Sequence, residues 1–174
     1  NYPIKLSWSR EEDMTHDLYR PHYVDHIQAA LDDNLEPTGW RQHIAGASVL
    51  ASYVGSLPDS GVDGDAVEVA IDPIYALSDL EVQYNRQDAK SVNISWWRGV
   101  GPLRSTFVQE SFIDELAHHA NVDPLTFRYD RLKEHPRAQA LLKVVEKASD
   151  WHSALPGGHG RGVAISHVFG GYVA

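Results

Sequence analysis

The spacing of apolar and polar residues differs between the two halves of the chain. In the first half the two classes alternate, which is typical of strands with one buried face. Residues 4–8 have this alternation and predict a half-buried strand. Two longer runs, 19–31 and 38–48, flank Asp32-Asp33-Asn34, a cluster of turn-forming residues. They predict a long β-hairpin.

Shorter signals lie around this hairpin. Ser9 and Glu12 have the spacing of a capping box and predict a short helical turn. Residues 55–65 are rich in Gly, Pro, Asp and Ser and predict an exposed loop. Further extended segments are expected over 67–72, 80–84 and 92–97.

The second half of the chain has helical spacing. Apolar residues recur every three or four positions over 105–120. Asp123-Pro124 predicts the start of a second helix, because Asp is a good N-cap and Pro suits the first turn. Pro136 predicts the start of a third helix. Residues 160–174 are glycine-rich and apolar, and predict a returning strand.

The order of these elements indicates the fold class. Strands come first, helices follow and a strand returns, which favours an α+β fold over a regular alternating α/β sheet. We expect a single unit over 1–174, with 1–97 mainly strands, 98–150 mainly helical and 160–174 a strand. The chain opens without an initiator methionine and closes on an apolar, strand-like run, so we interpret it as an internal fragment of a larger domain.

Composition narrows the function classes. Hydrophobic residues make up 43% and charged residues 22%, as in globular proteins, and the formal net charge of −9 disfavours nucleic acid as a partner. The absence of cysteine excludes disulfides, thiolate zinc sites and iron–sulfur ligation within the chain. No apolar run approaches the length of a membrane span.

The ten histidines and the acidic clusters are candidates for catalytic or metal sites. His22 and His26 are four residues apart, but on a strand they lie too far from each other to share one ion. The adjacent His118 and His119 would point in different directions on a helix. Glu110 and Asp114 share a helix face, which we expect to be solvated. The sequence therefore predicts no metal site and no catalytic carboxylate pair.

The segment 96–102 combines two tryptophans, an arginine and two glycines immediately before a helix. Glycine lets the backbone approach a ligand closely, arginine supplies a planar cationic donor, and tryptophan supplies a wall for a flat ring. A tight turn before a helix with packed tryptophans explains the same residues equally well. Chemistry alone leaves these two readings open.

Several motifs resemble the molybdopterin-binding large subunit of the xanthine dehydrogenase/aldehyde oxidase family. Residues 97–101 (WRGVG) resemble the family's Arg-Gly-x-Gly turn, and residues 110–117 (ESFIDELA) resemble the helix that follows it. Residues 3–6 and 9–14 upstream, and 160–164 and 169–174 downstream, are similar to further family segments in the same order. The Trp before the turn is typical of members like the isoquinoline 1-oxidoreductase beta chain.

This resemblance implies a function for the parent protein. Family members carry molybdenum on a molybdopterin, in bacteria usually the cytosine dinucleotide form. They hydroxylate N-heterocycles or aldehydes with oxygen derived from water and pass electrons to an iron–sulfur subunit or domain. The resemblance implies that Arg98, Gly99, Val100 and Gly101 contact the cofactor, with Trp96 and Trp97 as secondary pocket residues. Val100 stands where members often carry an aromatic substrate wall.

The resemblance also limits what these 174 residues are expected to do. The family's main cofactor loops and its catalytic glutamate have no match here, so we identify no catalytic residue and expect the fragment to be inactive and to hold no cofactor tightly. The alternatives are a non-catalytic scaffold with the same fold and a small histidine-based metal-binding protein. A homodimer stays open, as does a periplasmic or cytoplasmic location in a bacterium.

Overall fold

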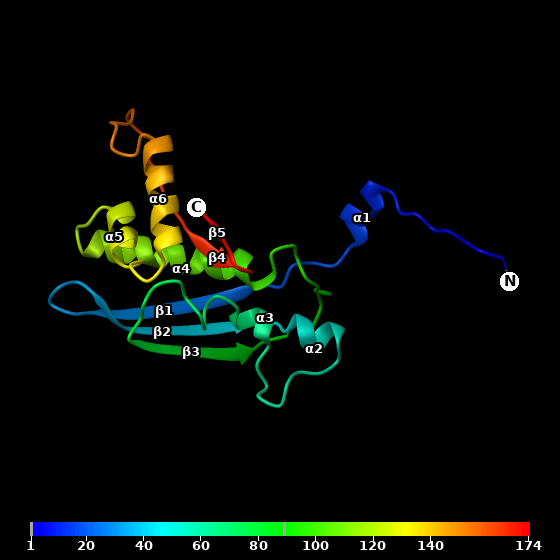
Figure 1. Cartoon of the computed structure of the whole chain (residues 1–174). Coiled ribbons are helices and arrows are strands. Elements are labelled where there is room, and N and C mark those ends of the chain that lie inside the picture. Colours follow the sequence, from blue (N-terminus) through cyan, green and yellow to red (C-terminus); the bar gives the residue numbers. More distant parts are fainter. Residues whose placement is uncertain (1, 89) are drawn as a thin grey trace.

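The computed structural model describes residues 2–88 and 90–174 (Figure 1). A three-stranded sheet is built from β1 (Tyr23–Leu31), β2 (Pro37–Gly46) and β3 (Asp79–Arg86) in that order. β1 and β2 are antiparallel, whereas β2 and β3 are parallel. The predicted strand at 80–84 lies within β3, and the mixture of strands and helices confirms the α+β class.

The predicted hairpin is confirmed as β1 and β2. Its turn is fixed by Asp32, whose carboxylate Oδ1 accepts hydrogen bonds from the backbone N–H groups of Asn34 (2.8 Å) and Glu36 (2.9 Å). An aspartate whose side chain accepts hydrogen bonds from backbone N–H groups a few residues later in the sequence commonly forms a turn. The local sequence therefore sets the register of the two strands.

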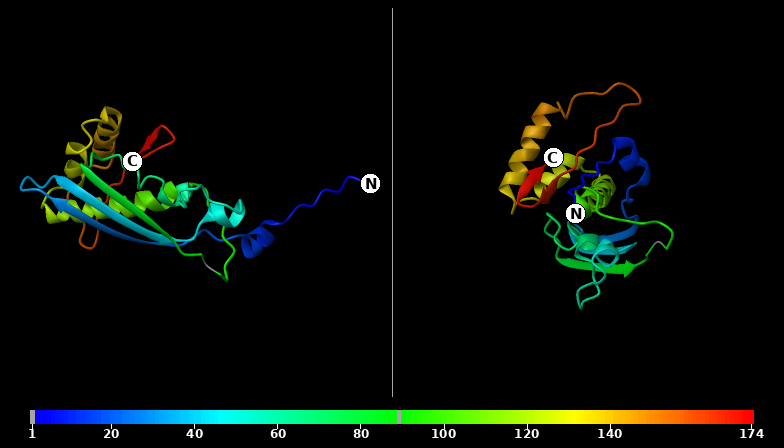
Figure 2. Two further views of the ribbon diagram at one scale, coloured as in Figure 1. Left: turned by 90° about the horizontal axis from the view of Figure 1, so that it is seen from below. Right: turned by 90° about the vertical axis from the view of Figure 1, so that its right-hand side faces the viewer.

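The sheet has one buried face, and α4 (Val100–His119) lies along it (Figures 1 and 2). Trp40 of β2 packs edge-on against Phe112 of α4, with ring centroids 5.1 Å apart. The same core contains Ile113 and Leu116 of α4. Burying this apolar stripe against the sheet supplies the main hydrophobic stabilisation of the fold.

Two further helices complete this core. α5 (Pro124–Asp130) begins as predicted, because Asp123 Oδ1 accepts hydrogen bonds from the backbone N–H groups of Leu125 (3.0 Å) and Thr126 (2.9 Å). α6 (Pro136–Ala148) begins at its predicted proline and buries Ala138 and Leu142. α4 begins at Val100, five residues before the predicted start, because the turn at 97–100 leads directly into it.

The connection between β2 and β3 differs from the prediction. It contains two short helices, α2 (Val49–Tyr53) and α3 (Gly64–Val67), so the predicted extended segment at 67–72 is wrong. Asp63 explains α3, because its side chain accepts a hydrogen bond from the Asp65 N–H (2.9 Å) and caps the helix. The predicted extended segment at 92–97 is reduced to one bridge between Ile94 and Tyr19.

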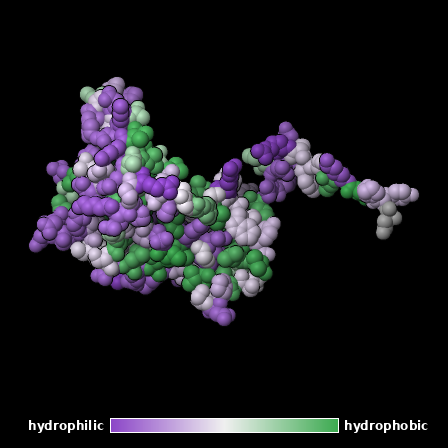
Figure 3. Space-filling model, in the orientation of Figure 1, coloured by the Kyte–Doolittle hydropathy of each residue, from purple (hydrophilic) through white to green (hydrophobic). Residues whose placement is uncertain are grey.

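The two ends of the chain also differ from the prediction. Residues 160–174 form a small hairpin of β4 (Ser166–Val168) and β5 (Gly171–Val173) instead of one strand. At the other end, α1 (Arg10–His16) is confirmed, with Ser9 Oγ accepting a hydrogen bond from the Glu12 N–H (3.2 Å). Residues 4–8 pair with no strand in the described part of the chain and are exposed, so the predicted half-buried strand is wrong. They belong to an arm that projects from the body (Figure 3).

Glu110 is the largest departure from the expected solvated face of α4. Its carboxylate is buried and accepts three hydrogen bonds, from the Tyr75 hydroxyl (2.7 Å), Arg128 Nε (2.8 Å) and the Ile165 backbone N–H (2.8 Å). Arg128 also contacts the carboxylate of Asp114 (2.6 Å). This network ties α4 to α5, to the loop before β3 and to the C-terminal segment.

Candidate functional site

The backbone turns sharply where the tryptophan pair meets α4. Val100 N–H donates to the Trp97 carbonyl (2.8 Å), and Leu103 N–H donates to the Gly99 carbonyl (3.2 Å). Gly99 and Val100 both have positive φ, +101° and +46°. Glycine adopts this conformation freely, but a β-branched valine is strained there. The surrounding structure therefore holds Val100 in an unfavourable backbone geometry.

Gly101 is required by the contact between α3 and α4. A Cβ on Gly101 would lie 2.4 Å from the backbone oxygen of Asp65 and 2.7 Å from Cβ of Glu68. Only a residue without a side chain lets the first turn of α4 approach α3 this closely. The glycine thus has a packing role in addition to the proposed contact with a cofactor.

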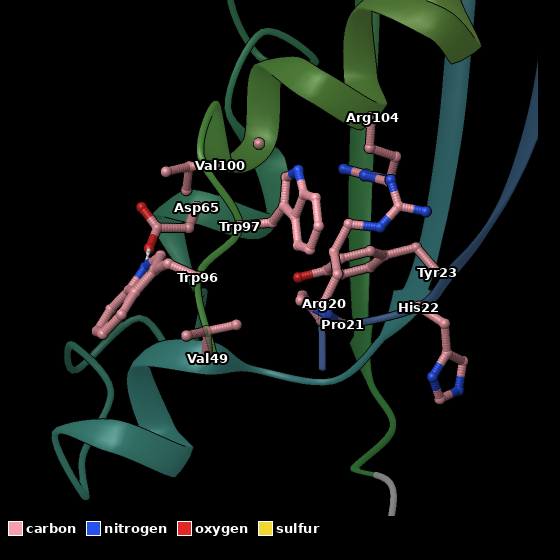
Figure 4. A pocket seen from close by; sticks show the side chains of 11 residues that line it. Arg20, Pro21, His22, Tyr23, Val49, Asp65, Trp96, Trp97, Val100 and Arg104 are labelled. Carbon is pink, nitrogen blue, oxygen red and sulfur yellow. Dashed lines mark hydrogen bonds between the residues drawn. The ribbon is translucent and has the colours of Figure 1, made fainter. Parts of the chain in front are cut away.

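A cavity of about 160 Å³ lies beside this turn (Figure 4). Four of the residues predicted for the site line it: Trp96, Trp97, Val100 and Gly101. Arg98 and Gly99 are not among the lining residues. The remainder of the wall comes from the start of β1, from α2 and α3 and from α4: Arg20, Pro21, His22, Tyr23, Val49, Asp65 and Arg104.

The two tryptophans are held differently. Trp96 Nε1 donates to Asp65 Oδ2 (2.6 Å), and its ring packs edge-on against Tyr53, with centroids 5.0 Å apart. Trp97 is the more exposed of the two, at 57% against 39%. Trp96 is therefore fixed by its contacts, whereas Trp97 presents an open aromatic face beside the cavity.

Arg104 is a cavity residue that the sequence analysis missed. It forms a largely buried ion pair with Asp25 of β1, with Nη1 2.7 Å from Oδ1 and 2.6 Å from Oδ2. Its Nη2 donates to the Ala66 carbonyl, and its guanidinium lies over the Tyr23 ring, 4.3 Å from the centroid. Asp25 and Arg104 are 79 positions apart, so no local sequence pattern signals the pair.

Arg104 also has an unpaired donor. Its Nε is buried without a hydrogen-bond partner among the described residues. Burial and the negative charge of Asp63 raise the pKa of Tyr23 to about 12, while Arg104 opposes this shift. Tyr23 is thus a neutral phenol at physiological pH, and the cavity floor combines an aromatic ring with a cation whose charge is largely offset by Asp25.

Acidic groups limit what the N-terminus of α4 can bind. The carboxylate of Glu68 lies against Gly101 in the first turn of α4, and burial and the nearby Asp65 raise the pKa of Glu68. A helix N-terminus attracts anions through its free N–H groups. Here the negative charge of Glu68 already lies beside this turn. The exposed cation next to the turn is Arg98, which takes part in none of the ion pairs recorded for the described residues.

A metal centre with three or more protein ligands and a membrane-spanning helix are both absent from the described parts of the chain. Within residues 2–88 and 90–174, no group of three or more His, Cys, Asp or Glu side chains is placed to hold a metal ion. No helix in the same ranges has both the length and the apolar character that crossing a bilayer requires.

Comparisons with known proteins agree with the motifs around the turn. A family model for the molybdopterin cofactor-binding domain matches residues 1–132. The isoquinoline 1-oxidoreductase beta chain of Brevundimonas diminuta is 30% identical over 97% of the chain. A nicotinate dehydrogenase subunit of Pseudomonas putida is 34% identical over 60% of the chain. A membrane-bound aldehyde dehydrogenase (pyrroloquinoline-quinone) of Gluconacetobacter polyoxogenes is 26% identical over 94%.

The chain spans 22%, 8% and 24% of the lengths of these three relatives, respectively. The family match covers residues 1–132, which include the whole Trp96–Gly101 segment, the ion pair of Asp25 and Arg104, and the Glu110 network up to Arg128. The family resemblance inferred from the sequence is thus confirmed, and the chain belongs to the molybdopterin cofactor-binding domain family.

Proposed function

We propose that this chain forms one wall of the molybdopterin site in a larger molybdenum-dependent oxidoreductase subunit, with residues 98–101 facing the cofactor. The observation that carries the proposal is the left-handed turn at Gly99 and Val100. Such strain concentrates at functional sites. The turn places an exposed arginine and an exposed tryptophan next to each other at the start of α4.

The residues of this turn fit one side of such a cofactor. The guanidinium of Arg98 is suited to a phosphate, which it can contact through two parallel hydrogen bonds. The open face of Trp97 is suited to a flat ring. The cavity of about 160 Å³ is smaller than the ~300–1,000 Å³ of typical ligand pockets. It therefore accommodates an edge of a ligand, and the remaining contacts must come from other parts of the parent.

The roles of the individual residues follow from this placement. When bound, the cofactor supplies the oxygen-transfer and redox chemistry, and the protein binds and orients it. Arg98 holds an anionic group, Gly99 and Gly101 permit close approach of the backbone, and Val100 contributes an aliphatic contact. Trp96 and Trp97 border the substrate side. None of the described carboxylates is assigned as the catalytic base.

The names of the relatives suggest the substrate class. Two name the heterocycles isoquinoline and nicotinate, and the third names an aldehyde. We infer that the parent hydroxylates an N-heterocycle or an aldehyde with water-derived oxygen. The third name also contains pyrroloquinoline quinone, but the match to the molybdopterin family model over residues 1–132 favours molybdopterin. We further infer the cytosine dinucleotide form, an iron–sulfur partner subunit, and a bacterial protein of the periplasm or cytoplasm.

The 174-residue chain by itself is expected to turn over no substrate. One arginine turn offers few contacts, and binding must offset the entropy lost on ordering the ligand. We expect no tight molybdopterin binding by the isolated chain. A scaffold without catalysis is the competing reading, and the molybdenum content of the parent separates the two.

The test uses the full-length parent, co-expressed with its iron–sulfur partner, and measures molybdenum by mass spectrometry. We expect about one molybdenum per subunit, and substantially less in the Arg98→Ala variant. Arg10→Ala, a change of another exposed arginine on α1, is the matched control and should leave the molybdenum content unchanged. A folded, partnered parent without molybdenum would support the scaffold reading, and equal contents in the two variants would remove Arg98 from the site.

A further inference from the structure

The outer face of the sheet brings two histidines together that are far apart in the sequence. His26 of β1 and His43 of β2 are direct partners in the antiparallel register. Both side chains point away from α4, because the alternate positions of these strands are the buried ones. Their ring centroids are 6.4 Å apart, with the ring planes inclined by 64°. Directly opposed residues on neighbouring strands are close enough to act on one ligand.

We propose that His26 and His43 form a binding site for a late first-row divalent ion such as Zn²⁺ or Ni²⁺. Imidazole is a preferred ligand of these ions. Metal–nitrogen distances of about 2.0–2.1 Å place the rings of two histidines on one ion with centroids roughly 5–6 Å apart. A movement of about one ångström by the exposed His26 ring brings the centroids into this range.

An unsatisfied nitrogen supports the proposal. His43 Nε2 is buried and has no hydrogen-bond partner among the described residues. The central position of β2 explains its burial, because neighbours from both β1 and β3 flank it. Buried polar atoms of this kind normally have a partner. A metal ion shared with His26 would supply one.

The charges around the pair are compatible with a cation. On β3, Gln83 is the register partner of His43, and Glu81 lies two residues before it on the same face. Glu81 accepts hydrogen bonds from Arg41 Nε (2.7 Å) and Gln83 Nε2 (2.5 Å). The hydrogen bond from Arg41 is the main cause of its lowered pKa, and His43 contributes less. Glu81 thus offsets part of the positive charge of Arg41 and of a bound ion.

A second histidine pair offers a natural comparison. His135 and His167 have ring centroids 6.1 Å apart. However, His167 stacks on Tyr172 at 4.3 Å, and the guanidinium of Arg137 lies over the same tyrosine at 5.1 Å. The stacked ring is less free to turn towards an ion, and the uncompensated arginine disfavours a cation. We therefore assign the site to the sheet.

With only two protein ligands, the site differs from a closed structural zinc site. It is an exchangeable site that links β1 to β2. It lies on the sheet face opposite the one that α4 covers, so it is independent of the proposed molybdopterin wall.

The test is a calorimetric titration of the 174-residue chain with zinc chloride alone at neutral pH. We expect one Zn²⁺ per chain, with affinity reduced on the order of tenfold or more in both His26→Gln and His43→Gln. His26→Gln is the decisive variant because its side chain is exposed, and circular dichroism verifies that it folds. The doubly substituted His135→Gln/His167→Gln chain is the matched control and should bind as the unchanged protein does.

Three outcomes would overturn the proposal. These are an absence of stoichiometric binding at micromolar zinc, unchanged binding by a folded His26→Gln chain, and a loss of binding confined to the His135/His167 control. Acidification supplies a second readout, because only neutral imidazole binds metal. Binding through this pair must therefore weaken on acidification.

Discussion

Glu110 and Arg128 form an ion pair that is almost entirely withdrawn from water, with 2.8 Å between Glu110 Oε2 and Arg128 Nε. Arg128 also binds two backbone carbonyls. Arg128 Nη2 donates to the Glu110 carbonyl (2.9 Å), and Nη1 donates to the Pro124 carbonyl (3.0 Å). The pair thus fixes α5 against the middle of α4, the helix that begins at the proposed cofactor turn.

Removing the charge of Glu110 should destabilise the protein strongly. Glu110→Gln keeps the shape but leaves the Arg128 guanidinium buried without its main counter-charge, and we expect a loss of about 3–5 kcal/mol in the free energy of unfolding. Urea unfolding followed by tryptophan fluorescence measures it. Asp114→Asn is the control, because Asp114 is 44% exposed and should cost only about 1 kcal/mol. Equal losses in the two variants would contradict the central role of Glu110.

A similar loss of stability is expected when the ion pair between Asp25 and Arg104 beside the cavity is broken. Asp25→Asn leaves Arg104 buried with an uncompensated charge and should lower the free energy of unfolding by about 3–5 kcal/mol. Glu36→Gln is the control. It breaks the pair with Arg131, in which the Glu36 side chain is 53% exposed, and should cost no more than about 1 kcal/mol. Thermal unfolding of both variants measures the two losses. A larger loss in Glu36→Gln than in Asp25→Asn would refute the stabilising role of the Asp25–Arg104 pair.

Gly101→Ala should disturb the start of α4. The added methyl would collide with the backbone oxygen of Asp65 and with Cβ of Glu68, and overpacking of this kind costs about 1–3 kcal/mol. Gly64→Ala on α3 has no atom within 4 Å of the new Cβ and should be neutral or slightly stabilising. Chemical denaturation compares the two. If Gly101→Ala matched Gly64→Ala in stability, the close approach of α3 and α4 would be incorrect.

Alkaline pH should destabilise the fold through its buried phenols. Burial raises the pKa of Tyr23 from its ordinary value of 10.0 to about 12. Between these two pH values the folded protein keeps the phenol proton, whereas the unfolded chain releases it. The free energy of unfolding is therefore unaffected by Tyr23 below pH 10 and falls as the pH rises through this window. The pKa values of Tyr75 and Tyr84 are raised by burial as well and act in the same direction.

Tyr23→Phe isolates the contribution of this residue. The slope of stability against pH counts the protons released on unfolding, and the variant should lower that count by up to one. Urea unfolding at a series of alkaline pH values, with tyrosinate absorbance recorded in parallel, gives the slope. A slope unchanged by the substitution would show that Tyr23 ionises normally in the folded state.

Sequence alone determined the elements that depend on local interactions. Ser9 with Glu12, Asp32 and Asp123 each bind backbone groups within four residues, so their motifs predicted a helix start, a turn and another helix start correctly. The family was also evident, because the Arg-Gly-x-Gly turn and the helix after it are contiguous motifs. Trp96, Trp97, Val100 and Gly101 line the cavity beside the turn, whereas the cofactor contacts predicted for residues 98–101 stay a prediction.

Tertiary structure decided the features that join distant segments. Residues 4–8 have the alternation of a strand, but alternation creates a strand only where a partner supplies hydrogen bonds, and the described chain contains none for them. Glu110 has the sequence context of a solvated helix residue, yet Arg128, Tyr75 and Ile165 surround it. Arg104 meets Asp25, and His26 meets His43, only through the packing of α4 and the register of β1 and β2. Periodicity along a sequence reports which face is apolar, whereas the identity of the groups that meet there depends on packing between segments that the sequence keeps apart.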